Sequence, residues 1–253
     1  MNEPDLLYEK KDHVAWITLN REARRNALSM EMIELFLGYL DDIAASSNVR
    51  VVCVTAVGDK AFCSGADLAG GDPLQGAKKY AELLKKMADC AKPLVAKLRG
   101  HCMAGGMGLM LACDLVYAAA HVKFGAPEVK VGLFPMMVTA LVMRNAVRKK
   151  AMEMLFTGNS LTAHEAEQMG LITRAYDAAE LDAKVSDILS TIAARAPLAI
   201  SMGRKAIRAV EGKGLDESLD YLCDQLAALA ATEDALEGMT AFIEKRPPAW
   251  KGR

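Results

Sequence analysis

Apolar and polar residues recur along the chain at the two spacings that distinguish strands from helices. Residues 13–19 alternate polar and apolar side chains and run into Asn20-Arg21, which predicts a strand followed by a turn. Residues 50–57 and 93–98 are nearly continuous apolar runs, a pattern typical of strands that are covered on both faces. Residues 114–119 predict a fourth strand.

Helical spacing fills the intervals between these strands and dominates the chain after Val138. Ser29 stands where a helix N-cap belongs, and the apolar residues of one face follow it: Met32, Ile33, Phe36, Leu37 and Leu40. Further helices are expected over residues 77–89, 107–112, 178–195, 199–210, 215–231 and 234–245. The alternation of strands and helices predicts an α/β fold of stacked turns, followed by a helical carboxyl-terminal region.

Composition narrows the class of protein. The 253 residues fit one large α/β domain or a domain with a helical appendage. A formal net charge of −1 without a basic run argues against nucleic-acid binding. No apolar stretch of about twenty residues occurs, and the charged amino terminus does not resemble a signal peptide, so we expect a soluble, cytoplasmic protein without a membrane partner.

Cysteine and histidine are placed without the spacing of metal ligands. The six cysteines form no CxxC pair and mostly lie in apolar runs, and the four histidines are isolated. We therefore expect a reducing compartment and no metal site.

Two glycine-bearing loops carry the candidate chemistry. The first spans residues 61–68 and the second spans residues 99–108; each follows a buried strand, and the second runs directly into a helix. Side by side, two such loops can direct two backbone N–H groups at one oxygen, and each donor is worth about 3–4 kcal/mol to a developing oxyanion. Either loop alone is also compatible with an ordinary structural turn. The second loop lacks the Lys-Ser/Thr of a P-loop and lies far from the first strand, where a dinucleotide fingerprint belongs.

The residues in and around these loops resemble the crotonase family of enoyl-CoA hydratases and isomerases, and the resemblance extends over essentially the whole chain. The matching stretches include Asn20-Arg21 with Arg25-Asn26-Ala27-Leu28-Ser29, Ser64-Gly65-Ala66-Asp67-Leu68, Gly105-Gly106 with Ala112-Cys113-Asp114, Phe124-Gly125-Ala126-Pro127-Glu128 with Gly132-Leu133-Phe134-Pro135, Phe156-Thr157-Gly158, and Lys245-Arg246-Pro247-Pro248-Ala249-Trp250.

The resemblance implies a spiral of ββα turns with a helical trimerisation region, as trimers or dimers of trimers. Residues 1–195 would form the core and residues 196–253 the helical region of the same structural unit. One face of that region, with Leu219, Leu222, Leu226 and Leu229, either covers its own core or contributes to self-association. The substrate would be an acyl-CoA thioester, so coenzyme A belongs to the substrate and no cofactor is expected.

Residue by residue, the resemblance implies that the N–H groups of Ala66 and Gly105 bind the thioester oxygen. Ser64, Ala66 and Leu68 would lie along the adenine and pantetheine of coenzyme A. Arg24 or Arg25, together with Lys245, would contact its phosphates, although surface Arg and Lys side chains are usually only solvated.

The chain departs from the family pattern at one position. The best-studied hydratases of this family use two glutamates, and here the second is present as Glu128 while Gly108 occupies the first position. Two mechanisms remain open. Glu128 can handle both the water and the proton of a hydration, or it can shuttle one proton as a Δ3,Δ2-enoyl-CoA isomerase. A catalytically silent acyl-CoA-binding protein is a third alternative, and hydratase is the preferred one because that name covers most of the family.

Apolar residues around Glu128 suggest an acyl pocket. Pro127 precedes it, Val129, Val131, Leu133 and Phe134 follow it, and we expect their burial to raise the pKa of the carboxyl group. Met103, Gly108, Phe134 and Met136 are expected to shape the acyl site. Closely spaced methionines also serve as core filler. A solvated loop carboxylate is the structural alternative for Glu128.

Overall fold

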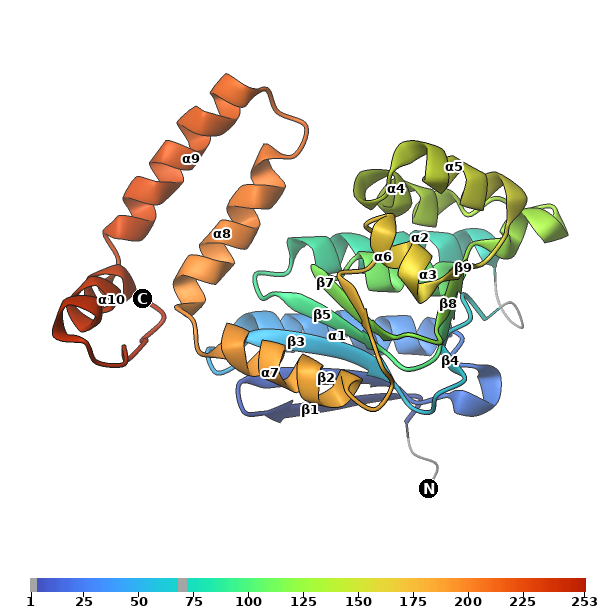
Figure 1. Cartoon of the computed structure of the whole chain (residues 1–253), viewed down its shortest axis with the longest axis horizontal. Coiled ribbons are helices and arrows are strands. Elements are labelled where there is room, and N and C mark those ends of the chain that lie inside the picture. The colour runs from blue at the N-terminus through green and yellow to red at the C-terminus, as the bar shows by residue number, and fades with distance from the viewer. Residues whose placement is uncertain (1–3, 68–71) are drawn as a thin grey trace.

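The computed structural model describes residues 4–67 and 72–253 and consists of two sheets covered by helices (Figure 1). The α/β class predicted from the alternation of strands and helices is confirmed. Leu68, one of the predicted substrate contacts, lies outside the described residues.

The larger sheet contains six strands in the order β1-β2-β3-β5-β7-β10. The first pair, β1 and β2, is antiparallel, and the remaining neighbours are parallel. Its strands are β1 (Leu6–Lys11), β2 (Val14–Leu19), β3 (Val51–Ala56), β5 (Leu94–Leu98), β7 (Leu115–Ala119) and β10 (Arg174–Tyr176). Residues Val51 to Thr55 of β3 are all buried, as predicted for a strand covered on both faces.

The smaller sheet has four short strands in the order β4-β6-β8-β9. They are β4 (Ala61–Cys63), β6 (His101–Met103), β8 (Lys123–Gly125) and β9 (Leu161–Thr162). The first three are parallel and follow β3, β5 and β7 of the larger sheet in turn. Because the chain repeats this step three times, the segments that leave β4, β6 and β8 emerge at the same edge of the smaller sheet.

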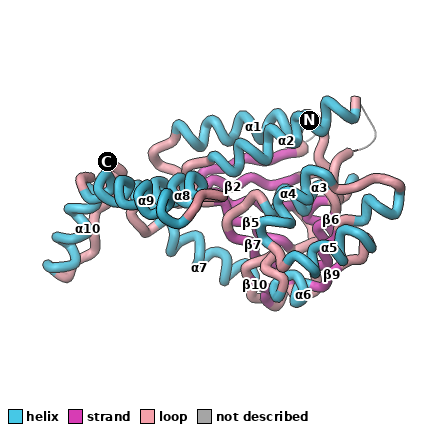
Figure 2. Tube along the Cα trace, turned by 90° about the horizontal axis from the view of Figure 1, so that it is seen from above, coloured by secondary structure: helices cyan, strands magenta, loops and turns pink. Residues whose placement is uncertain are grey.

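Helices cover both faces of the larger sheet (Figure 2). One face carries α1 (Met30–Ala45) and α2 (Pro73–Asp89), and the other carries α7 (Leu181–Ala193). The side chain of Ser29 accepts a hydrogen bond from the Met32 amide at 3.2 Å, which confirms the predicted N-cap. The start predicted for α2 at residue 77 was wrong, since Asp72 caps the helix at the Leu74 amide and Pro73 occupies the first turn, where it needs no amide partner.

A second group of helices lies over the smaller sheet. It consists of α3 (Gly105–Leu111), α4 (Met136–Asn145), α5 (Arg148–Thr157) and α6 (Ala163–Gln168), with the 3-10 turn η2 (Pro127–Val131); another 3-10 turn, η1 (Glu22–Arg24), follows β2. Helix α4 packs on α3, which directly follows the second glycine loop.

The last three helices, α8 (Pro197–Val210), α9 (Leu215–Ala230) and α10 (Glu233–Glu244), extend away from the two sheets (Figure 1). Arg204 attaches α8 to the part of the fold that contains the larger sheet. It pairs with Asp114 at 2.8 Å and donates to the carbonyl groups of Met87 and Ala88. The carboxyl-terminal tail folds back, and Trp250 donates to the Ala194 carbonyl at 2.8 Å.

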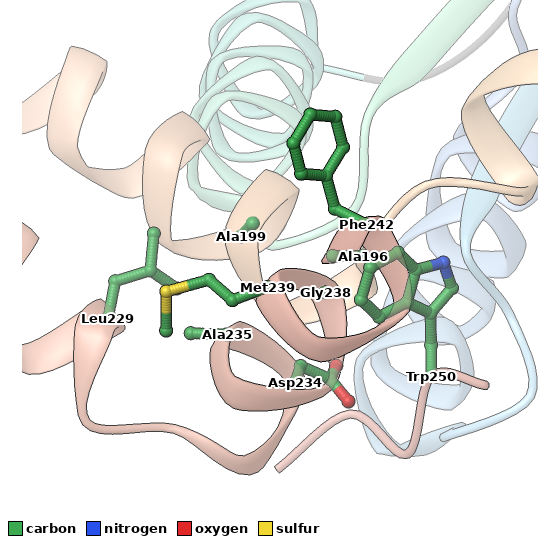
Figure 3. A pocket seen from close by; sticks show the side chains of 9 residues that line it. All are labelled: Ala196, Ala199, Leu229, Asp234, Ala235, Gly238, Met239, Phe242 and Trp250. Atoms are coloured by element: carbon green, nitrogen blue, oxygen red, sulfur yellow. The ribbon is translucent and has the colours of Figure 1, made fainter. Parts of the chain in front are cut away.

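An apolar pocket lies between these helices and the tail, lined by Ala196, Ala199, Leu229, Asp234, Ala235, Gly238, Met239, Phe242 and Trp250 (Figure 3). Its volume is about 400 Å³. Asp234 is buried there and accepts from the Lys251 amide at 2.7 Å, so its carboxylate is used to hold the tail.

Over residues 4–67 and 72–253, no single helix is long and apolar enough to cross a membrane; α7 and α8 reach that length only as a pair bent by 99°. The same residues contain no cluster of His, Cys, Asp or Glu suited to a metal ion.

Candidate active site

Three segments that are distant in sequence meet where β4, β6 and β8 end. The first glycine loop leaves β4, the second leaves β6, and η2 with Glu128 follows β8. The parallel pairing of β4 with β6 and of β6 with β8 fixes their order, so the second loop lies between the first loop and η2. The topology thus brings the three predicted catalytic residues to one edge.

The two glycine loops are in direct backbone contact. A Cβ atom built on Gly105 would lie 3.4 Å from the amide nitrogen of Ala66, and one built on Gly65 would lie 2.9 Å from the Cβ of Ala104. Gly65 also has a φ of 111°, a conformation that side chains disfavour. Glycine at these positions therefore allows the close approach of the two loops.

The amide of Ala66 is oriented by a short parallel bridge to Leu28. Leu28 donates to the Gly65 carbonyl at 2.9 Å, and the Asp67 amide donates back to the Leu28 carbonyl at 2.9 Å. In a parallel bridge these bonds flank Ala66 and leave its own N–H pointing to the opposite side. Ala66 is exposed, and among the hydrogen bonds found in residues 4–67 and 72–253 its amide donates to no partner.

Buried polar side chains support this loop from beneath. Asn26, which is fully buried, donates to the carbonyl groups of Val57 and Ala61, at 3.2 and 2.7 Å, and accepts from the Arg21 amide at 2.8 Å. Arg21 pairs with Asp67 at 2.6 Å. The motif residues around the turn after β2 thus hold the first loop in place.

The amide of Gly105 is the first of α3, where no intrahelical acceptor is available to it. The peptide that carries it is set by Ala104, which has φ 51° and ψ −126°. This conformation is rare for a residue with a side chain and costs about 1–3 kcal/mol. The Ala104 amide donates to the Gly125 carbonyl at 2.8 Å, so the segment before Glu128 holds the strained turn. Sequence reasoning missed Ala104, because alanine gives no signal of positive φ.

Glu128 lies in the first turn of η2, and its Oε2 atom is buried without a hydrogen-bond partner. Burial raises the pKa of this carboxyl group, as predicted, and its own backbone amide opposes the rise. The expected source of that burial was partly wrong: Val131 and Leu133, two of the apolar neighbours in sequence, are 74% and 58% exposed. Val131 ends the 3-10 turn and Leu133 follows it, and because both side chains are exposed they do not bury the carboxylate.

Gly108 is buried in α3, and its surroundings explain why no larger residue stands there. A Cβ atom built on Gly108 would lie 2.2 Å from the hydroxyl oxygen of Tyr80 and 3.4 Å from a methyl group of Val138. The space next to Gly108 is therefore filled by a tyrosine from α2. Sequence reasoning did not identify Tyr80.

The other predicted contacts are dispersed. Ser64 is half-buried in the first loop, and its amide donates to the Arg25 carbonyl at 3.1 Å, which places Arg25 beside this loop. Arg24 and Arg25 have exposed side chains. Lys245 ends α10, which lies at the opposite end of the molecule from the smaller sheet, so the structure does not bring it to Glu128 within one chain (Figures 1 and 2).

The predicted acyl-site residues come from β6 and from the segment that contains Glu128, and they differ in exposure. Pro127 begins η2 and is half-buried, as is Met103 at the end of β6. Phe134 is half-buried and faces the ring of Phe156 at 6.4 Å, whereas Met136 is 68% exposed at the start of α4. An exposed Met136 can shape only the rim of a site.

This arrangement defines an α/β enzyme of the crotonase type. The fold closely matches crotonase-fold enoyl-CoA hydratases: the crystal structure of the enoyl-CoA hydratase from Bacillus anthracis has a TM-score of 0.94 at 31% sequence identity, with 99% of this chain and 100% of that chain covered. The enoyl-CoA hydratase structure from Mycobacterium smegmatis has a TM-score of 0.91 at 31% identity, over 98% of this chain and 99% of that one. The predicted crotonase fold is thereby confirmed.

The sequence comparisons identify the family. The family model described as enoyl-CoA hydratase/isomerase matches residues 9–253. The 2,3-dehydroadipyl-CoA hydratase of Escherichia coli is 31% identical over 98% of this chain and 99% of its own. The chain therefore belongs to the enoyl-CoA hydratase/isomerase family.

Proposed function

We propose that the chain is an enoyl-CoA hydratase in which the amides of Ala66 and Gly105 hold the thioester oxygen and Glu128 acts as both base and acid. The observation that carries this proposal is the buried, unpartnered Oε2 atom of Glu128 on the segment next to the second loop. Unsatisfied buried polar atoms are rare in proteins, and those that occur often belong to sites of chemistry.

The proposed reaction balances with one carboxylate. Glu128 takes a proton from water as the oxygen attacks C3 of the double bond, and the electron pair moves through C2 to the thioester oxygen. The two amides stabilise the resulting enolate. Glu128 then returns the proton to C2, which yields the 3-hydroxyacyl thioester and restores the carboxylate.

The presence of Gly108 favours one alternative reaction, the isomerisation of a 3-enoyl thioester. Glu128 would remove a proton from C2 and return it to C4, and the same two amides would hold the intermediate dienolate. One carboxylate is sufficient for this shuttle, because no water has to be activated.

A single absorbance experiment separates these reactions. Purified protein is mixed with crotonyl-CoA and, separately, with a 3-enoyl-CoA, while the absorbance of the conjugated thioester is followed. Hydration predicts loss of absorbance from crotonyl-CoA, and isomerisation predicts gain from the 3-enoyl substrate. If neither signal changes although coenzyme A thioesters raise the Tm, the protein is a silent binder and the proposed catalysis is contradicted.

The contacts to coenzyme A form part of the same proposal. Ser64 and Ala66 would line its pantetheine, and the exposed Arg24 and Arg25 beside the first loop would meet its phosphates. Lys245 would reach the site from a second copy of the chain in a trimer or a dimer of trimers. The exposed apolar side chains of α9 and α10 support such an assembly, with Leu226 67% and Phe242 85% exposed.

A further inference from the structure

Tyr80 belongs to α2, yet its side chain reaches into α3 beneath the second glycine loop. It is 7% exposed, and its hydroxyl group donates to the carbonyl oxygen of Gly105. A Cβ atom built on Gly108 would lie 2.2 Å from this hydroxyl oxygen and 3.2 Å from the ring carbon that bears it. The tyrosine thus contacts both the residue proposed to bind the oxyanion and the residue that replaces the first family glutamate.

We propose that Tyr80 is a positioning residue for the reaction: its hydroxyl group holds Gly105 so that the Gly105 amide points at the thioester oxygen, and its ring reserves the space beside Gly108. The inference rests on the proposed function, since it concerns the orientation of the amide that the reaction would use.

The hydrogen bond acts on the part of the backbone that most needs support. Gly105 lacks a side chain and follows the strained Ala104, so hydrogen bonds set the orientation of its two adjacent peptide planes. In the plane that carries its N–H group, the Ala104 carbonyl accepts from the Met107 amide at 2.9 Å. A hydrogen bond to its carbonyl oxygen fixes one of these planes and limits the rotation of the other, which carries the N–H group. A small misalignment of a donor weakens stabilisation of the transition state more than it weakens binding of the substrate.

The Tyr80 hydroxyl group stays protonated and therefore remains a hydrogen-bond donor. Burial raises the pKa of Tyr80 well above its ordinary value, and the charge of Glu128 acts in the same direction. The hydroxyl group therefore keeps its proton across the physiological range and cannot serve as a base. Glu128 remains the group that moves protons.

Tyr80 and Gly108 also form a complementary pair. Any side chain at position 108 meets the hydroxyl group first, so a carboxylate there would require the tyrosine side chain to shift. The pair consequently limits the site to a single carboxylate, which distinguishes this chain from two-glutamate hydratases.

The first test replaces Tyr80 by Phe, which removes the hydrogen bond and keeps the ring. With whichever thioester the wild type converts, kcat is expected to fall about tenfold or more while KM changes less than about twofold. Tyr39→Phe is the matched control, because Tyr39 also donates to a backbone carbonyl, that of Leu6, at 3.4 Å on another part of the fold. Its kcat should equal that of the wild type.

A spectroscopic readout separates positioning from general loss of structure. A cinnamoyl-CoA thioester absorbs at longer wavelength when its carbonyl is polarised, and this red shift should appear with the wild type and Tyr39→Phe and be smaller with Tyr80→Phe. A Tyr80→Phe variant with the kcat and red shift of the wild type overturns the inference. A wild type that converts neither thioester contradicts the proposed function instead.

A double-mutant cycle tests the complementary pair. Gly108→Ala places a methyl group against the hydroxyl oxygen, so it should lower the Tm and reduce kcat about tenfold. In the Tyr80→Phe background the nearest ring atom lies 3.2 Å away, and the same change should cost at least about three times less activity. Equal costs in the two backgrounds overturn the pairing.

Discussion

Glu128 illustrates how a residue can be unfavourable for stability and useful for chemistry. Its buried Oε2 has lost the hydrogen bonds of water without gaining any from the protein. An unsatisfied buried polar group costs about 1–3 kcal/mol. The same environment raises the pKa of the carboxyl group and so makes the carboxylate a stronger base.

Glu128→Gln is accordingly expected to abolish turnover and to leave coenzyme A affinity nearly unchanged, because the base contributes to the transition state. The substitution should also raise the Tm at pH 7.5 by about 2–4 °C, since it removes a penalised charge. Rate assays and thermal scans of the two proteins provide the comparison. An unchanged rate would assign the chemistry to another residue.

The pH dependence follows from the sign of the shift. Because the pKa of Glu128 is raised above the ordinary value of 4.5, kcat/KM should fall with decreasing pH at a midpoint higher than that of an ordinary glutamate. For stability, folding favours the protonated form, so this contribution is present at low pH and is lost as pH rises through the folded pKa. The Tm gain of Glu128→Gln should therefore disappear in acid. A gain independent of pH contradicts this account.

Ala104 gives a prediction about strain. Its positive φ is natural for glycine, so Ala104→Gly should keep or slightly raise the Tm, whereas Ala104→Val should lower it by several degrees. Differential scanning fluorimetry provides the measurement. A glycine variant less stable than the valine variant would show that the turn is not strained.

At the scale of elements, the sequence predicted the long helices and the buried strands because caps and periodicity identify them. Strand β1 was missed, since five of its six positions are only partly buried or exposed and its charged end lies at the sheet edge. Strands β4, β6 and β8 were also missed, because three residues are too few to show a period. These short strands position the candidate site, so its residues were accessible through the family resemblance and not through periodicity. Tyr80 and Ala104 act through contacts between elements, which no local pattern reveals.

Arg204 provides a prediction at this scale. Its side chain is 13% exposed and connects α8 to Asp114 and to the last turn of α2. Arg204→Ala removes the ion pair with Asp114 and the hydrogen bonds to the carbonyl groups of α2, and it should lower the free energy of unfolding by about 2–4 kcal/mol. Arg208→Ala, at an exposed pair with Asp89, is the control and should change it by less than about 0.5 kcal/mol. Chemical denaturation distinguishes the two, and equal effects would show that Arg204 is not an anchor.

At the scale of the whole molecule, helices α8, α9 and α10 expose more apolar surface than one chain can bury. Phe242 and Ile243 are 85% and 79% exposed at the end of α10. The predicted trimer would cover them, and sedimentation velocity should give a mass of three or six chains. Replacing both by Glu should shift the species to monomers. A wild-type monomer at micromolar concentration contradicts the proposed assembly.

The central claim is that two backbone amides and one carboxylate surround the reacting thioester. A crystal structure of Glu128→Gln with a bound enoyl-CoA tests it most directly. We predict the thioester oxygen at about 2.7–3.1 Å from the amide nitrogens of both Ala66 and Gly105, with the side chain at position 128 facing C2 and C3. A thioester oxygen bound to neither amide, or a side chain at position 128 turned away from the double bond, would contradict the account.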